Sequence, residues 1–486
     1  MVAKTRIFFQ RRSLGLILIA LAFVLGMFAF IQNSKSSRSS IELVYAQNLV
    51  SINPFTYADY NNSRLNYIYE SLVTFSEDLK IAPKLAVSFG QISPSHYRFR
   101  IKDNVFFHNG QHLTAEYLKS LFANLSQFES QKPLIANITD FQVTGDYQFD
   151  IYLQNPDPLF LSKLASVPIA FVETDLIANP IGTGPFMVKA QSQNQIYLEP
   201  FSNYHAKQAR FKQLLLTTIP NQTQRLDYSL SNPNVLAIFG VSPVLQEQFT
   251  QANFDLENYV EGSTNFFLYN YNRKLSQNPN FRTALRQAMQ LDMNFRDFSE
   301  GMAKDTNQLL ASGVFGYNPN IQPLDLLELP ATTFQPQILM PIGFDNLADK
   351  LTQSLQKHGI EAEFTFANSF ELSSAEISSQ YDLIFFGFKS DFYDGHSFFT
   401  TFLESETFNF GSYKNPQANQ LLQDLESLQK PKARQKVLQE LSSLLVEASY
   451  PLAEPLFESQ VYYALSQNYT LQPRLDGYLD LTLIQY

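Results

Sequence analysis

Histidine is the side chain best suited to metal or acid–base chemistry at neutral pH, and its spacing along this chain builds no clear site. Six histidines are scattered, at positions 96, 108, 112, 205, 358 and 396. His108 and His112 are four residues apart, which suits a metal on one face of a helix. The Asn-Gly pair at 109–110 breaks a helix and predicts a tight turn, so we interpret the two histidines as an exposed pair at a turn.

One further constellation could do chemistry, because His396 lies near Asp391 and Asp394. A weak metal or acid–base site is possible there, and the lining of a loop is the favoured interpretation. The G-x-S-x-G, H-E-x-x-H, Walker, G-x-G-x-x-G and EF-hand patterns do not occur. The chain has no cysteine, which excludes thiolate metal sites, a cysteine nucleophile and a lipidated N-terminal cysteine. We therefore expect no catalytic residue, no metal and no cofactor, and a protein that is not an enzyme.

Length and charge narrow the class of protein. The 486 residues allow two to four domains, and 45% hydrophobic with 16% charged residues indicates a globular chain. Residues 1–40 hold six basic residues and no acid, whereas 41–486 hold 29 basic and 45 acidic residues. An acidic body argues against nucleic acid as a partner and against flat docking on an anionic membrane surface.

The N-terminal segment predicts a membrane anchor. Residues 14–31 carry no charge over eighteen positions, near the ~20 that span a bilayer core. Arg11 and Arg12 precede this run and no small-residue cleavage site follows it. We expect an uncleaved, single-pass signal anchor, with 41–486 outside the cytoplasmic membrane, in the periplasm or at the cell surface. A cleaved signal peptide of unusual length is the alternative.

Strand and helix patterns alternate along the body. Period-two alternation and apolar runs predict strands at 41–50, 97–101, 148–153, 361–366 and 381–386. Helical spacing predicts helices at 66–73, at 347–355 with a stop at Gly359, and at 437–445. Caps predict three more, starting at Thr114 and running to about Leu125, at Asn280, and at Pro416. No repeat of 20–50 residues occurs, so we expect an α/β or α+β chain of several lobes.

The most specific pattern lies within 49–125, which reads LVSINPF, NYIYESLVTF, IAPKLAVSF and YRFRIKDNVFFHNGQHLTAEYLKSLF in order. It resembles the extracellular solute-binding proteins of family 5, the oligopeptide-, dipeptide- and nickel-binding components of ABC importers. Further stretches match that family in the right order: IGTGPF at 181–186, NFRTALRQAMQLD at 280–292, YDLIFFGFKSDFYDGHSF at 381–398, and 413–455. The resemblance covers about 41–486.

Three departures from the family pattern concern the pocket. Phe388 stands where the family usually has Trp, and Gly395 replaces the usual Pro. The stretch 311–336 is shortened, so a helix often found there is expected to be missing.

The resemblance implies an α/β, two-lobed fold of the periplasmic-binding-protein type II class with an extra small α+β domain, preceded by one transmembrane helix. The implied division is 1–40 for the head, anchor and linker, 41–75 with 168–262 and 456–486 for lobe one, 76–167 for the small domain, and 263–455 for lobe two. The ligand would lie between the lobes, which close over it.

The resemblance also implies which residues hold the ligand. In peptide-binding relatives an Asp at the position of Asp391 takes the peptide's ammonium group, and Phe388 would wall the pocket. A loop Asp that caps a turn and a plain core Phe are the respective alternatives. Further candidates in cleft-facing segments are Phe392, Tyr393, Asn53, Tyr57, Tyr269 and Asn270, with strand core as the favoured alternative for Tyr269.

We therefore expect a membrane-tethered, monomeric binding protein that captures a short peptide and delivers it to the permease subunits of an ABC transporter. The open alternatives are a peptide-sensing receptor module without transport, or a non-peptide solute such as a nickel complex, haem or a sugar.

Overall fold

The computed structural model of the chain describes residues 40–49, 51–56, 63–173, 175–299, 301–321, 332–405, 407–409, 411–446, 450–471, 474 and 477–484. No helix within these ranges is long and apolar enough to cross a membrane. The anchor predicted at 14–31 lies outside the described residues.

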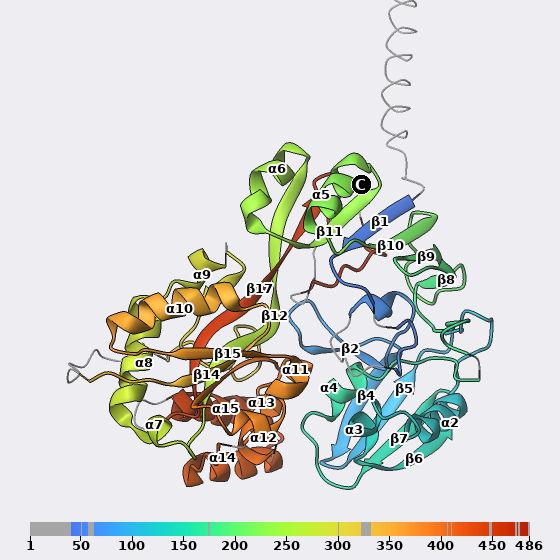
Figure 1. Cartoon of the computed structure of the whole chain (residues 1–486). Coiled ribbons are helices and arrows are strands. Elements are labelled where there is room, and N and C mark those ends of the chain that lie inside the picture. Colours follow the sequence, from blue (N-terminus) through green and yellow to red (C-terminus); the bar gives the residue numbers. More distant parts are fainter. Residues whose placement is uncertain are drawn as a thin grey trace, which may run out of the picture.

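One large sheet runs through two bodies of the molecule (Figure 1). Its strand order is β15-β14-β16-β12-β17-β11-β1-β10-β9-β8. One end comprises β1 (Ser40–Tyr45), β8 (Phe186–Gln191), β9 (Gln195–Pro200), β10 (Gln213–Thr218) and β11 (Val235–Val241). The other end comprises β14 (Gln337–Pro341), β15 (Glu363–Ala367) and β16 (Leu383–Lys389). β1 runs parallel to both of its neighbours, as buried α/β strands do.

Two long antiparallel strands, β12 (Phe254–Tyr269) and β17 (Ala453–Ser466), join the two ends. β17 pairs with β11 at one end and β12 pairs with β16 at the other, so the same two strands belong to both bodies. The short strand β13 (Ala303–Asp305) pairs with the middle of β17. This crossing pair is the only connection between the two bodies that the large sheet itself provides along the described chain.

A separate four-stranded sheet lies beside the first end (Figure 1). Its order is β4 (Ala86–Ser93), β5 (His96–Ile101), β7 (Gln148–Leu153) and β6 (Ile138–Gly145), and a hairpin of β2 (Val73–Phe75) and β3 (Ile81–Pro83) leads into it. The helix α2 (Ala115–Leu125) packs on it, with α3 (Lys132–Ile135) and α4 (Phe160–Ala165) nearby. Thr114 caps α2 by accepting from the Tyr117 amide, as predicted.

The remaining helices cover the large sheet. At its first end lie η1 (Ser63–Tyr67), α5 (Gln222–Ser231), η2 (Pro243–Leu245) and α6 (Gln246–Gln251). At its second end lie α7 (Lys274–Gln277), α8 (Pro279–Leu291), α9 (Phe295–Phe298), α10 (Asp345–Lys357), α11 (Ser369–Leu372), α12 (Ala375–Ser378), η3 (Asp391–Tyr393), α13 (His396–Glu404), α14 (Pro416–Ser427) and α15 (Pro431–Val446).

Two main hydrophobic cores define the two bodies. We call the residues that pack around the first core, within 41–239 and 463–484, the first body. Those around the second core, within 266–456, form the second body. One residue breaks this rule, because Phe392 packs in the first core although its neighbours in sequence belong to the second.

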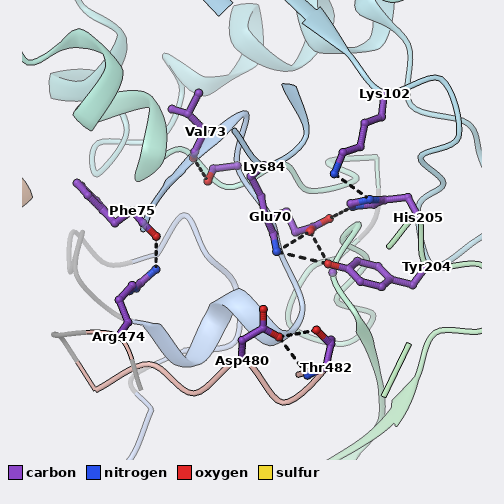
Figure 2. A network of polar contacts seen from close by, with 12 residues as sticks. Glu70, Val73, Phe75, Lys84, Lys102, Tyr204, His205, Arg474, Asp480 and Thr482 are labelled. Carbon is purple, nitrogen blue, oxygen red and sulfur yellow. Dashed lines mark hydrogen bonds and ion pairs between the residues drawn. The ribbon is translucent and has the colours of Figure 1, made fainter. Parts of the chain in front are cut away.

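A buried ion-pair network fastens the first body internally (Figure 2). The Glu70 carboxylate accepts from the Tyr204 hydroxyl at 2.9 Å, contacts His205 Nε2 at 2.8 Å and pairs with Lys84 Nζ at 3.3 Å. Burial by itself would raise the pKa of Glu70, but Lys84 and the hydrogen bonds from His205 and Tyr204 lower it to about 2. The network ties the segment that follows β9 to the residues on either side of the β2–β3 hairpin, which leads into the small sheet.

The structure corrects one predicted element and several boundaries. The helix predicted at 66–73 is absent: η1 ends at Tyr67, and Glu70 forms a bridge to Ile169 before β2 starts. α8 begins at Pro279 under an Asn278 cap rather than at Asn280, and α15 begins at Pro431 where the helix was predicted from 437. The strand predicted at 41–50 is β1, which ends at Tyr45, and the strand predicted at 381–386 is β16, which runs from Leu383 to Lys389.

Candidate functional site

The two bodies meet at η3, which follows β16. Phe392 is 8% exposed and packs in the first core. Its neighbour Tyr393 packs edge-on against Phe75 of β2, with ring centroids 5.9 Å apart at 84°. A second bridge is a hydrogen bond from Gln91 Nε2 to Gln429 Oε1, at 3.3 Å. The short segment 391–393 is therefore an interface element between two bodies.

The backbone of this segment is strained. Phe392 and Tyr393 have φ of 57° and 53°, in the left-handed region that bulky residues avoid. Each such residue costs about 1–2 kcal/mol. Strain of this kind persists where the surrounding structure enforces it and clusters at functional sites.

Residues of the second body hold the strained turn in place. The Tyr393 carbonyl accepts from the Phe315 amide at 2.7 Å. Just beyond it, both Asp394 carboxylate oxygens accept from Arg434 Nη2, at 3.1 and 3.0 Å, in a buried ion pair. The Asp391 amide donates to Ser397 Oγ at 3.0 Å. The second body thus presents the two aromatic side chains to the first body on a fixed support.

Asp391 opens η3 and is half-buried, directly beside Phe392. This places the carboxylate expected to hold an ammonium group at the junction of the two bodies. Whether it contacts a ligand stays a prediction.

His396 makes no acid–base constellation with Asp394, because the Asp394 carboxylate is taken by Arg434 and by the His396 backbone amide. Neither ring nitrogen of His396 has a hydrogen-bond partner among the described residues. Burial lowers the pKa of His396, which favours the neutral ring. Within the described ranges no group of three or more His, Asp or Glu is arranged to hold a metal ion.

Phe388 lies on β16 and packs edge-on against Phe398 and Phe402 of α13, with ring centroids 5.4 and 5.3 Å away. It stands opposite Thr264 of β12, and Thr264 in turn stands opposite Glu458 of β17. Residues that pair across strands share a face of the sheet, so these three form a row at the hinge end of the second body.

Two atoms of this row are unusual. Thr264 Oγ1 and Glu458 Oε1 are buried and have no hydrogen-bond partner among the described residues. The other Glu458 oxygen accepts from Ser312 Oγ, at 2.5 Å, and lies 3.5 Å from Lys304 Nζ. Beyond strand periodicity, no sequence pattern indicates either residue, because their meeting depends on the register of three strands.

Tyr269 and Asn270 lie deep in the second body, away from η3. Tyr269 is 1% exposed and its hydroxyl is 3.4 Å from Glu454 Oε2. The Asn270 amide donates to the carbonyls of Ser379 and Tyr381, both at 2.9 Å. These bonds give both residues roles inside the second body, so their contact with a ligand stays a prediction.

Asn53 and Tyr57 were expected near the ligand from the first body. Asn53 Oδ1 accepts from the Phe55 amide at 3.0 Å, which makes a turn. Tyr57 lies outside the described residues.

The glycine motif at 181–186 has a packing role. A Cβ on Gly182 would lie 2.1 Å from the Ile68 carbonyl oxygen, so only glycine fits.

His108 Nε2 lies 2.9 Å from the Gly184 carbonyl oxygen, and burial lowers the pKa of His108 to about 4. His108 is therefore a half-buried residue bonded to the Gly182–Gly184 turn, which corrects its interpretation as part of an exposed pair.

The fold and its interface element define the class of two-lobed α/β binding proteins, in which two bodies share a pair of crossing strands. The model of "Bacterial extracellular solute-binding proteins, family 5 Middle" matches residues 80–333, slightly more than half of the chain. The chain belongs to this family.

Solved structures share the fold over almost their whole length. NikA from Brucella suis in complex with Fe(III)-EDTA has a TM-score of 0.79 at 17% identity and covers 92% of this chain and 99% of its own. HbpA2 from Haemophilus parasuis has a TM-score of 0.80 at 17% identity, with the same coverage. DppA from Helicobacter pylori in complex with peptide STSA has a TM-score of 0.71 at 19% identity, covering 93% and 98%.

One relative found by sequence similarity carries the name of a transcriptional regulator. The "HTH-type transcriptional regulator SgrR" of Yersinia enterocolitica is 28% identical over 222 residues, which is 44% of this chain. That match spans 37% of the regulator's length.

Proposed function

We propose that the chain captures a short peptide between its two bodies and delivers it to an ABC importer. The observation that carries this proposal is η3, a strained segment of the second body whose Phe392 reaches the first core. Contacts of this kind exist only when the bodies are together, so they give the closed state a defined geometry. Closure over a solute is how two-lobed proteins bind.

The peptide assignment rests on Asp391. It precedes the interface aromatics and matches the ammonium-binding position of the family motif. A charge-assisted hydrogen bond to a carboxylate contributes about 1.5–3 kcal/mol. Phe388 and the unpartnered Thr264 and Glu458 atoms at the hinge supply an apolar wall and two further hydrogen-bonding groups.

We assign the moving units as 41–75 with 168–262 and 456–486 for lobe one, 76–167 for the small domain, and 263–455 for lobe two. The two hydrophobic cores support the separation of lobe two from the rest, with η3 as the element that crosses between them, whereas lobe one and the small domain share the first core. We also propose a monomer, tethered to the membrane by 14–31 with the body extracytoplasmic.

A second candidate function is ligand sensing without transport. The likeness to HTH-type transcriptional regulators favours it, because it joins this kind of body to regulation. Co-purification from membranes separates the two: a permease supports transport, and a signalling protein without a permease supports sensing.

Peptide binding by residues 40–486 tests the proposal. A pool of tri- to pentapeptides should raise the melting temperature, and the same pool with acetylated N-termini should do so far less. Asp391→Asn should weaken binding of the free-amine pool by roughly 10- to 100-fold. Asp349→Asn, at an exposed site on α10, is the matched control and should bind as the unchanged protein does. Equal binding of both pools to both variants would refute the role of Asp391.

A further inference from the structure

A cavity of about 830 Å³ lies entirely within the second body, apart from the interface at η3. Its walls come from the end of α8, the loop before α9, β13 and the residues after it, and the start of β17. Cavities of ~300–1,000 Å³ are the size that encloses small organic molecules. The volume therefore suffices for a ligand of its own.

The cavity exists because one sheet edge is left open. β12 covers one side of β17 at Ala453–Pro455. On the other side β13 pairs with 457–459 and ends at Asp305, and no other described strand covers the edge at 454–456. The cavity is lined by Glu454, Pro455 and Leu456 at this edge.

An incompletely satisfied arginine lines the cavity. Arg286, on α8, is 5% exposed and its Nε donates to Glu454 Oε2 at 2.8 Å. Its Nη1 and Nη2 groups are buried and have no hydrogen-bond partner among the described residues. Leaving two guanidinium donors unmet is costly, so such an arrangement needs an explanation.

The rest of the lining suits an organic anion. Lys304, which also lies 3.5 Å from Glu458, is a second cation, and the Gln290 amide lines the cavity, whereas the amides of Asn294 and Asn307 already donate to Asp297 and to the Ile321 carbonyl. Met289, Met293, Phe295 and Ile321 form an apolar wall. The two carboxylates in the lining are already engaged, since Glu454 pairs with Arg286 and Asp305 accepts from the Phe295 amide at 2.8 Å.

We propose that this cavity is a second ligand site, which takes a small organic molecule with one oxyanion, a carboxylate or a phosphate monoester, on the Nη1 and Nη2 groups of Arg286. A planar guanidinium fork matches such groups with two parallel hydrogen bonds. Because Nη1 and Nη2 are buried, binding requires side chains of the wall to shift, and the methionines are the most adaptable of these side chains. None of the residues that line this cavity lies in the segment 381–398, so the site shares no residue with the one proposed around Asp391.

Benzoate and phenyl phosphate are the probes, and benzamide is the uncharged control. Each is added to residues 40–486 at about 10 mM, since ligands this small are expected to bind with Kd of about 1 mM. Benzoate or phenyl phosphate should raise the melting temperature of the protein, and benzamide should not. The anion that binds more tightly shows whether the site prefers a carboxylate or a phosphate monoester. A crystal soaked with the better probe should place its oxyanion on Arg286.

Three variants make the test decisive. The double variant Arg286→Met with Glu454→Leu removes both partners of the ion pair, so that no buried charge is left without its partner. It should weaken probe binding at least tenfold. Arg286→Lys keeps the charge without the fork and should weaken binding less. Asp391→Asn should leave probe binding unchanged whether or not the peptide proposal holds.

The proposal is overturned if neither anion binds the unchanged protein, if benzamide binds equally well, if the double variant binds as tightly as the unchanged protein, or if the soaked crystal shows only water beside Arg286.

Discussion

The contact of Phe392 with the first core makes a quantitative prediction about closure. Burial of a phenylalanine side chain contributes about 1.5–3 kcal/mol. Phe392 is 8% exposed in this structure and its core partners belong to the first body, so this contribution is lost when the bodies separate. Phe392→Ala should therefore shift the closed-to-open ratio of the ligand-free protein by roughly 10- to 100-fold toward open.

Small-angle scattering of ligand-free protein measures this shift, because separated bodies have a larger radius of gyration. The variant should also bind its ligand more weakly by the same factor, since part of the free energy of binding is then used to bring the two bodies together. Phe402→Ala is the matched control: Phe402 is buried wholly within the second body and should lower stability without opening the molecule. Unchanged scattering and unchanged affinity for Phe392→Ala would refute the interface role of η3.

Three further predictions concern the supports of the fold. The pKa of Glu70 in the folded state is about 2 against an ordinary value of 4.5, so the stability from its ion pairs is complete above about pH 4.5 and is lost as pH falls toward 2. Urea unfolding at about pH 5 and pH 3 should show that Glu70→Gln removes about 2 kcal/mol of this pH dependence, and an equal dependence in both proteins would contradict it. Gly182→Ala should destabilise by about 3 kcal/mol or more, because its Cβ would lie 2.1 Å from the Ile68 oxygen, whereas Gly145→Ala, with its nearest neighbour at 3.9 Å, should be near neutral in thermal unfolding. Arg434→Met should cost about 3–5 kcal/mol by stranding the buried Asp394, and Arg434→Met with Asp394→Leu should recover most of it; no recovery in calorimetry would show that the pair does more than neutralise charge.

Local patterns predicted the elements whose causes are local. Thr114 caps α2 and Pro416 opens α14, because cap and first-turn preferences act within a few residues. The helix expected at 66–73 failed for the opposite reason. Its apolar spacing is helical, but Glu70 pairs with Ile169, almost a hundred residues away, and the tertiary contact overrides the local preference.

The candidate site was predictable only in part. The motif at 381–398 led to the segment that forms the interface, including Phe392 and Tyr393. Its left-handed backbone and its packing against Phe75 depend on contacts between residues more than three hundred positions apart, which no spacing reveals. Asn270 was a ligand candidate because its segment starts lobe two at a place expected to face the cleft, and spacing could not reveal that its amide donates to two backbone carbonyls of the second body.

The most direct test of the central claim is to identify what the protein carries. Residues 40–486 are purified without added ligand and denatured, and the released small molecules are analysed by mass spectrometry. An enclosed ligand present at about 100 times its Kd adds about 2.7 kcal/mol of stability and survives purification. The account predicts a mixed population of short peptides of narrow length, which Asp391→Asn loses and Asp349→Asn retains. A single non-peptide species, or the same peptides bound to Asp391→Asn, would contradict it.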